Sequence, residues 1–239
     1  MKSYFLPSIL FKKKWVWFAR PSLPDDSDVV TFFSYDDVSL PDFVKKEGWT
    51  SVIDLFKPKE EIWNSFRPGF ISEQIKKGER HGIVVRVDDN WDGFRELYKN
   101  FRKHKGIKLD DERVFKKHGL LFSAYLKDEL LASGVFISDS ENIRAWALCS
   151  KRLDGQDGKK RETIGQANRM IIWEAIKYGK ERNMLRFDFG GIELGEDGQN
   201  PPLTVFKEAF GGARAKNFFY TKINSPVLKL LRKIRRILK

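Results

Sequence analysis

The stretch that decides the fold of this chain reads Leu185-Arg186-Phe187-Asp188-Phe189-Gly190-Gly191, then Pro201-Pro202-Leu203-Thr204-Val205-Phe206-Lys207-Glu208-Ala209-Phe210-Gly211-Gly212. In the first half, three apolar side chains alternate with Arg186 and Asp188, the period of two that a strand with distinct faces requires. The glycine pair that ends this strand permits a positive φ and a close approach to a ligand. The second half begins with proline and ends with glycine, which predicts a short helix.

Composition excludes several classes of protein. Among 239 residues, 7 Trp and 20 Phe argue against disorder. The single cysteine, Cys149, excludes an internal disulfide and a cysteine-rich zinc site. The three histidines lack metal-ligand spacing, and Walker and Rossmann glycine patterns are absent, so we expect no metal, no nucleotide hydrolysis and no redox chemistry. A formal net charge of +12 indicates an anionic partner.

The rest of the chain predicts an α/β (α+β) protein. Apolar alternation and turn residues place strands at residues 29–35, 52–55, 83–87, 121–126, 130–137, 143–150 and 185–189. Helical spacing places helices at residues 59–66, 71–80, 91–101, 163–182 and 227–239, besides the short helix above. The strands at 121–150 indicate an antiparallel meander. Thr163 and Gln166 fit a capping box at the start of the helix that follows.

At these residues the chain resembles the Fem family of peptidyl and aminoacyl transferases, within the GNAT-like N-acyltransferases. The matching pattern is Phe-Asp-Phe-Gly-Gly at 187–191, followed by Phe-Lys-x-x-Phe-Gly-Gly at 206–212, and weaker resemblance covers about 51–222. The local spacing alone would equally fit a tight strand-to-helix packing motif with no catalytic role. The resemblance implies a GNAT-like mixed sheet, splayed at its centre and flanked by helices.

The resemblance also implies a domain arrangement. We expect residues 1–87 to form a truncated, degenerate GNAT-like half, although no internal repeat supports a duplication. Residues 88–224 would then form the acyltransferase core. Residues 225–239 form a basic amphipathic helix that suits an anionic membrane surface, or that packs on its own domain.

Acyl transfer needs a bound activated donor, and the predicted helix start at Thr163 would supply free N–H groups to the donor's phosphates. GNAT enzymes hold the pyrophosphate of coenzyme A with a loop of the form Arg-x-x-Gly-x-Ala, and this chain has one residue more between Arg161 and Gly165. The departure leaves room for aminoacyl-tRNA, the donor that the Fem enzymes use. The residues that the resemblance assigns to the donor are Arg161, Thr163, Ile164, Gly165, Gln166 and Ala167.

The resemblance assigns the chemistry and the acceptor to the motif and to one basic helix. Lys207, with Phe206 beside it, would stabilise the oxyanion, and Asp188 would accept the proton of the amine. The alternatives are a surface lysine and an ion pair between Asp188 and Arg186. The acceptor would contact Lys76, Lys77, Gly190, Gly191, Phe210 and Gly211, whereas a solvated helix face is the alternative for the two lysines.

These expectations combine into one hypothesis and one competitor. The chain would be an N-acyltransferase that moves an acyl group, preferably from acyl-CoA and otherwise from aminoacyl-tRNA, to an amine. The amine would belong to an anionic nucleotide- or lipid-linked envelope precursor, such as an amino sugar or a peptidoglycan stem peptide. We expect it in the cytoplasm, at the inner face of the membrane, because no apolar run approaches the roughly 20 residues that span a bilayer. The competitor is a non-catalytic basic protein that binds RNA or a membrane.

Overall fold

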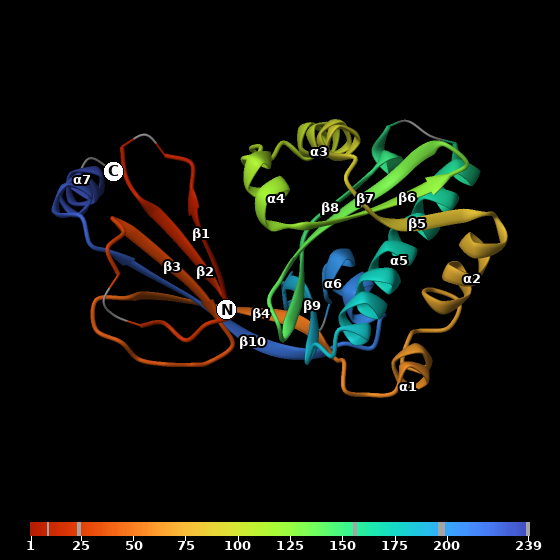
Figure 1. The fold of residues 1–239 in the computed structure, drawn as a ribbon, viewed down its shortest axis with the longest axis horizontal. Helices are drawn as coiled ribbons and strands as arrows, with labels where there is room; N and C mark the ends of the chain where they lie inside the picture. Colours follow the sequence, from red (N-terminus) through yellow and green to blue (C-terminus); the bar gives the residue numbers. More distant parts are fainter. Residues whose placement is uncertain (9, 23–24, 155–156, 196–198, 238–239) are drawn as a thin grey trace. The chain divides into compact units, whose positions relative to one another are not determined.

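The computed structural model describes residues 1–239 except 9, 23–24, 155–156, 196–198 and 238–239, and describes only the backbone of residues 153 and 232–237. The chain forms two compact units (Figure 1). Unit 1 comprises Met1–Thr50 and Ala215–Lys239, and unit 2 comprises Ser51–Arg214. The boundary expected between residues 87 and 88 therefore falls inside unit 2. The division differs because unit 1 combines strands from both ends of the chain.

Unit 1 is built on strands from both ends of the chain, in the order β1-β2-β3-β10-β4. The strands are β1 (Lys2–Leu6), β2 (Lys13–Trp17), β3 (Val29–Ser34), β4 (Val44–Asp54) and β10 (Ala213–Ile223). Strands β2 and β3 run parallel, and β3 pairs antiparallel with β10. The chain passes between the units within β4 and β10, and helix α7 (Pro226–Ile237) follows.

Unit 2 holds a mixed sheet in the order β4-β9-β8-β7-β6-β5. Its strands are β5 (Ile83–Asp88), β6 (Leu120–Leu126), β7 (Glu129–Ser138), β8 (Asn142–Ser150) and β9 (Arg186–Ile192). The expected meander is confirmed, because β6, β7 and β8 pair antiparallel. Strand β9 then pairs parallel with β8, after a crossover through α5 (Gly158–Glu181).

Helices cover both faces of this sheet (Figure 1). On one face α1 (Lys59–Asn64), α2 (Ser72–Arg80) and α5 pack in the larger core, which includes Phe136 and Ile171, both fully buried. On the other face α3 (Trp91–Lys105) and α4 (Glu112–His118) pack against Val135 and Cys149. The α/β class with a mixed sheet flanked by helices is confirmed.

Helix α5 begins earlier than the capping box indicated. Asp157 is its N-cap, and its side chain accepts a hydrogen bond from the N–H of Lys160 at 2.8 Å. Thr163 lies in the second turn, where its hydroxyl donates to the carbonyl of Lys159 at 3.1 Å. The prediction of Thr163 as N-cap is therefore wrong, and the backbone N–H groups at 163–165 lie within the helix rather than at its open end.

Candidate active site

The site begins where β8 and β9 stop pairing. Their register covers Asn142–Arg144 opposite Arg186–Asp188, while β8 continues to Ser150 and β9 to Ile192. Gly190 lies just beyond the last pair with φ of 79°, which the absence of a Cβ makes accessible. A Cβ at Gly190 would lie 3.2 Å from the carbonyl oxygen of Ala145 and 3.8 Å from Nζ of Lys207. The glycine therefore leaves space between the two strands at the end of their pairing.

Asp188 is a fully buried carboxylate with both oxygens in use. One oxygen accepts from Nη1 of Arg144, which lies opposite it in the strand register, and the other accepts from the N–H of Gly190 at 2.7 Å. Exposed fractions of 7% for the Arg144 side chain and 0% for Asp188 describe a buried ion pair. The partner is Arg144, which the sequence did not indicate. Because Asp188 is sealed from solvent, its geometry suits the positioning of Gly190 better than proton transfer from an incoming amine.

Lys207 reaches this space from α6 (Pro202–Glu208). Its ammonium donates to the carbonyl of Gly191 at 2.6 Å, and the side chain is half-buried. Burial, together with the nearby charge of Arg144 and against the opposing charge of Asp188, lowers the pKa of Lys207 to about 8. A half-buried lysine whose pKa is lowered toward neutrality is typical of functional sites.

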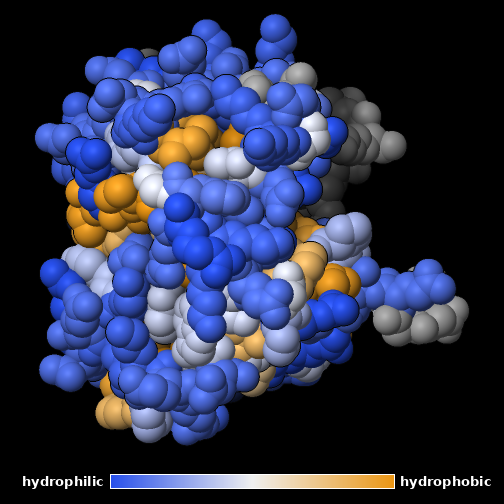
Figure 2. Space-filling model, turned by 90° about the vertical axis from the view of Figure 1, so that its right-hand side faces the viewer, coloured by the Kyte–Doolittle hydropathy of each residue, from blue (hydrophilic) through white to orange (hydrophobic). Residues whose placement is uncertain are grey.

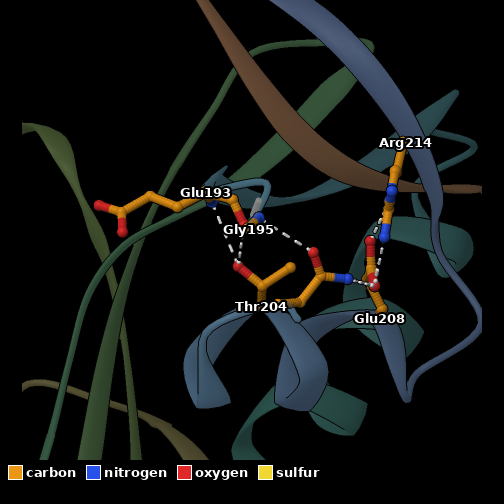
Figure 3. A network of polar contacts seen from close by, with 6 residues as sticks. Glu193, Gly195, Thr204, Glu208 and Arg214 are labelled. Atoms are coloured by element: carbon orange, nitrogen blue, oxygen red, sulfur yellow. Dashed lines mark hydrogen bonds and ion pairs between the residues drawn. The ribbon is translucent and has the colours of Figure 1, made fainter. Parts of the chain in front are cut away.

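A polar network holds α6 against the end of β9 (Figure 3). Thr204 donates to the carbonyl of Glu193 at 2.9 Å and accepts from the N–H of the same residue at 3.2 Å. Asn200 accepts from the N–H of Gly195 at 3.3 Å and donates to Glu208 at 3.4 Å, and Arg214 donates to the same carboxylate at 3.1 Å. The network fixes both ends of the helix that carries Lys207.

The motif's other residues are largely structural. Phe210 is fully buried against the rings of Phe66 and Phe189, with centroids 5.3 and 5.2 Å away. Gly211 has φ of 74°, and a Cβ there would meet Oγ of Ser65 at 2.3 Å. These contacts anchor the carboxyl end of α6. Phe206 is half-buried and contacts Phe210, with ring centroids 5.5 Å apart.

The residues expected to hold a donor fall into three groups. Ile164 and Ala167 are fully buried in the core, so their side chains serve packing. Thr163 and Gln166 line a cavity of about 610 Å³ together with Lys77 and His81. Arg161 and Gly165 line a second cavity on α5, which holds further arginines.

The first cavity lies between α2 and α5. Gln166 is buried and links the two helices, because it hydrogen-bonds Nδ1 of His81 at 2.9 Å and Oε1 of Gln74 at 3.3 Å. Lys77 lines the cavity, with its ammonium 3.8 Å from Glu162. Lys76 is exposed and lies 5.8 Å from the centroid of Trp63. The face of unit 2 that carries α2 and β5 is mostly hydrophilic (Figure 2), as a site for a polar ligand requires.

Two further findings concern metals and membranes. Within the described part of the chain, no cluster of histidine, cysteine and acidic side chains is arranged to hold a metal ion. None of the described helices has the length and apolarity that crossing a bilayer demands.

Comparison with known proteins identifies the fold. No protein-family model matches the chain, and neither does any curated protein. The structure of FemX aligns with a TM-score of 0.64 at 13% identity, over 94% of this chain and 84% of FemX.

Two further structures are similar. The C-terminal domain of a putative lysylphosphatidylglycerol synthetase from Agrobacterium fabrum aligns with a TM-score of 0.56 at 10% identity, over 88% of this chain and 72% of that chain. L-PGS from Bacillus licheniformis aligns with a TM-score of 0.54 at 14% identity, over 87% and 72% of the two chains. The chain therefore shares the fold of FemX and L-PGS, as the resemblance at 187–212 implied.

Proposed function

We propose that this chain is an amide-forming acyltransferase, which moves an acyl or aminoacyl group from an activated donor to an amine. The observation that carries the proposal is the position of Lys207, whose ammonium lies beside Gly190 and Gly191 of β9, just past the point where β8 and β9 stop pairing. The likeness in fold to FemX and L-PGS supports the same class of reaction.

In the proposed reaction the amine attacks the donor's carbonyl carbon, and a C–N bond forms while the carbonyl oxygen becomes negative. The protonated Lys207 stabilises this oxyanion, because a positive charge held in place beside developing negative charge lowers its energy. The C–S bond of a thioester, or the ester C–O bond of an aminoacyl-tRNA, then breaks. The oxyanion returns to a carbonyl as that bond breaks, and the departing thiolate or alkoxide takes up the proton that the amine loses. Asp188 is not assigned this proton, because both of its oxygens are engaged.

The donor and the acceptor are the finer part of the proposal. The preference for acyl-CoA over aminoacyl-tRNA depended on an approximate phosphate loop, and that segment lies inside α5. We therefore keep both donors, each of which presents phosphates to the basic residues of α2 and α5. For the acceptor we retain an amine on a nucleotide- or lipid-linked envelope precursor, and we prefer an amino sugar to a peptidoglycan stem peptide.

The test is transfer of a radiolabelled acyl group from acetyl-CoA, and in a parallel reaction from a charged tRNA mixture, to a panel of nucleotide-linked amino sugars and peptidoglycan precursors. Lys207→Met should lower the rate of the productive pair by about 10²–10³-fold, the usual cost of one oxyanion donor. Lys99→Met is the control, because Lys99 is exposed on α3. A Lys207→Met rate equal to that of the control would refute the role of Lys207. Absence of transfer with every pair, from a folded protein, would favour the non-catalytic basic binder.

We also propose that α7 associates with an anionic membrane surface. Val227, Leu230 and Leu231 are exposed, with fractions of 58, 59 and 51%. The segment from residue 226 to residue 239 contains six basic residues and no acidic one. Exposed apolar side chains in a segment with basic and no acidic residues favour binding to anionic lipid over packing against another basic helix.

A further inference from the structure

The loop between β1 and β2 exposes apolar side chains next to lysines. Residues 5–14 read Phe-Leu-Pro-Ser-Ile-Leu-Phe-Lys-Lys-Lys. Leu10 is 81% exposed and Phe5 is 53% exposed. Lys12 and Lys13, where β2 begins, are exposed as well. Exposed apolar groups bordered by charge are typical of a surface that meets a partner.

The register of the unit 1 sheet places this loop and the start of α7 at the same end. Leu6 of β1 pairs with Lys13 of β2, which pairs with Val29 of β3. Val29 in turn pairs with Ile223, the last residue of β10. The chain leaves β1 for the loop at this end, and it leaves β10 for α7 at this end as well (Figure 1).

Asp28 connects the loop to the entry of α7. Its carboxylate accepts a hydrogen bond from the N–H of Lys12 at 2.8 Å, and its carbonyl accepts one from the N–H of Asn224 at 2.9 Å. The side-chain amide of Asn224 donates to the carbonyls of Asp25 and Ser27 at 3.1 and 2.8 Å. One short segment therefore holds the base of the loop and the entry of α7, so a partner that meets the loop is within reach of the helix.

The apolar side chains of the loop are not closed over one another. They border a cavity of about 620 Å³, whose apolar lining residues are Phe5, Leu6, Leu10 and Phe11. Asp26 and Asp28 also line it, and Asp28 is engaged by the N–H of Lys12. Apolar surface that a partner can cover therefore remains around the cavity.

Positive charge at this end of unit 1 lacks a counter-charge. Lys14 forms an ion pair with Asp25 at 2.9 Å. Lys12 and Lys13, in contrast, form no ion pair with an acidic side chain in the part of the chain that the structure describes. Residues 226–239 add six basic residues and no acidic one, so the basic residues outnumber the acidic residues of the cavity wall.

This charge decides between two occupants. A second copy docked here by two-fold symmetry would place the same positive charges against one another, which opposes association. An anionic lipid surface accepts both the apolar side chains and the positive charge.

We infer that the loop between β1 and β2 inserts Leu10 into the interface of an anionic membrane and docks unit 1 there together with α7. Once one of the two contacts has formed, the other becomes intramolecular, so the pair binds more tightly than either alone. The inference rests on the membrane association proposed for α7 only for this second contact, and it does not depend on acyl transfer.

The first experiment places a fluorescent label on the loop. The single cysteine, Cys149, is buried, so Leu10→Cys offers one accessible thiol for an environment-sensitive fluorophore. Vesicles of phosphatidylglycerol and phosphatidylcholine should shift the emission to shorter wavelength, and lipids that carry a quencher near the headgroup should quench it. Leu109→Cys, at a position of unit 2 that is 50% exposed, is the matched control and should show neither effect.

Two outcomes of the labelling would overturn the inference. The first is unchanged emission at position 10 while the protein co-sediments with the vesicles, because α7 would then bind without the loop. The second is a shift without vesicles that grows with protein concentration, because the loop would then contact a second copy.

The second experiment measures co-sedimentation with the same vesicles. Leu10→Asp should bind about 10-fold more weakly than wild type, because it removes an apolar group from the interface and adds a negative charge. Leu109→Asp makes the same change in unit 2 and should bind like wild type. Equal binding by the two variants would contradict a role of the loop.

The outcome is separable from that of the proposed function. Leu10→Asp should leave acyl transfer to a soluble amine unchanged, because position 10 lies in unit 1 and Lys207 in unit 2. A protein that docks through the loop and transfers no acyl group would refute the proposed function and leave the docking surface intact.

Discussion

At the scale of single residues, Lys207 should be visible in the pH dependence of the proposed reaction. Its pKa of about 8 lies below the usual value of 10.5 because the side chain is buried and Arg144 is near. Since the protonated form stabilises the oxyanion, kcat/KM should fall about tenfold per pH unit above pH 8. Lys207→Arg should remove this fall, because a guanidinium stays charged throughout. The same descending limb in Lys207→Arg would assign it to another group.

Asp188 supports a second prediction at this scale. Asp188→Asn leaves the buried guanidinium of Arg144 without a counter-charge, which costs about 3–5 kcal/mol of unfolding free energy. The measurement is urea unfolding at pH 7. The control is Asp37→Asn, whose carboxylate forms an exposed ion pair with Lys45 at 2.6 Å and should cost less than about 1 kcal/mol. Similar losses in the two variants would contradict a buried pair.

The motif could be predicted at this scale, but the partners of its residues could not. The alternation around Asp188 correctly predicted a strand, and Phe187 and Phe189 on one of its faces are buried. The partner of Asp188 is Arg144, which comes from the neighbouring strand, 44 residues away, and only the register of the parallel pair brings the two together.

At the scale of elements, the start of α5 can be tested by two substitutions. Asp157→Ala removes the side chain that caps the N–H of Lys160, and should cost about 1 kcal/mol. Thr163→Ala should change stability by less than about 0.5 kcal/mol, because Thr163 lies inside the helix and bonds its preceding turn. Chemical denaturation of both variants provides the measurement. A larger loss in Thr163→Ala would restore the capping box as the start of the helix.

The structure explains which elements the sequence could predict. The strands of the meander alternate between two packed faces, so their period of two was visible. The first turns of α5 contain Gly158, Lys159 and Lys160, which show no apolar period, so the prediction began at the first pattern resembling a cap. The amino-terminal part of β4 is polar and exposed, which concealed a strand that begins at Val44 and not at residue 52.

At the scale of the whole molecule, the division into units could not be inferred from neighbouring residues. Unit 1 combines β1, β2 and β3 with β10, which lies near the other end of the chain. Pairs such as Phe33 with Phe219 join residues far apart in sequence. The boundary expected at residue 87 came from the resemblance, and no local feature of the sequence indicates that the two ends of the chain join in unit 1.

The charge of the whole molecule leads to the last prediction, which concerns α7 and membranes. Leu230→Asp/Leu231→Asp places two negative charges on the exposed apolar positions of α7. The double variant should reduce co-sedimentation with vesicles containing phosphatidylglycerol by at least 10-fold. The loss of apolar burial in the membrane and the repulsion between the new carboxylates and the anionic lipid both weaken binding.

The matched control changes the same charge in unit 2. Leu109→Asp/Ile107→Asp alters two side chains that are about half exposed, with fractions of 50 and 49%, and should leave vesicle binding near that of wild type. Wild type should bind zwitterionic vesicles weakly. It should dissociate from anionic vesicles as the salt concentration is raised, because salt screens the attraction between the basic residues and the lipid headgroups. Equal vesicle binding by the α7 variant and wild type would show that the net charge of +12 acts through another surface, and α7 would then have no role in membrane association.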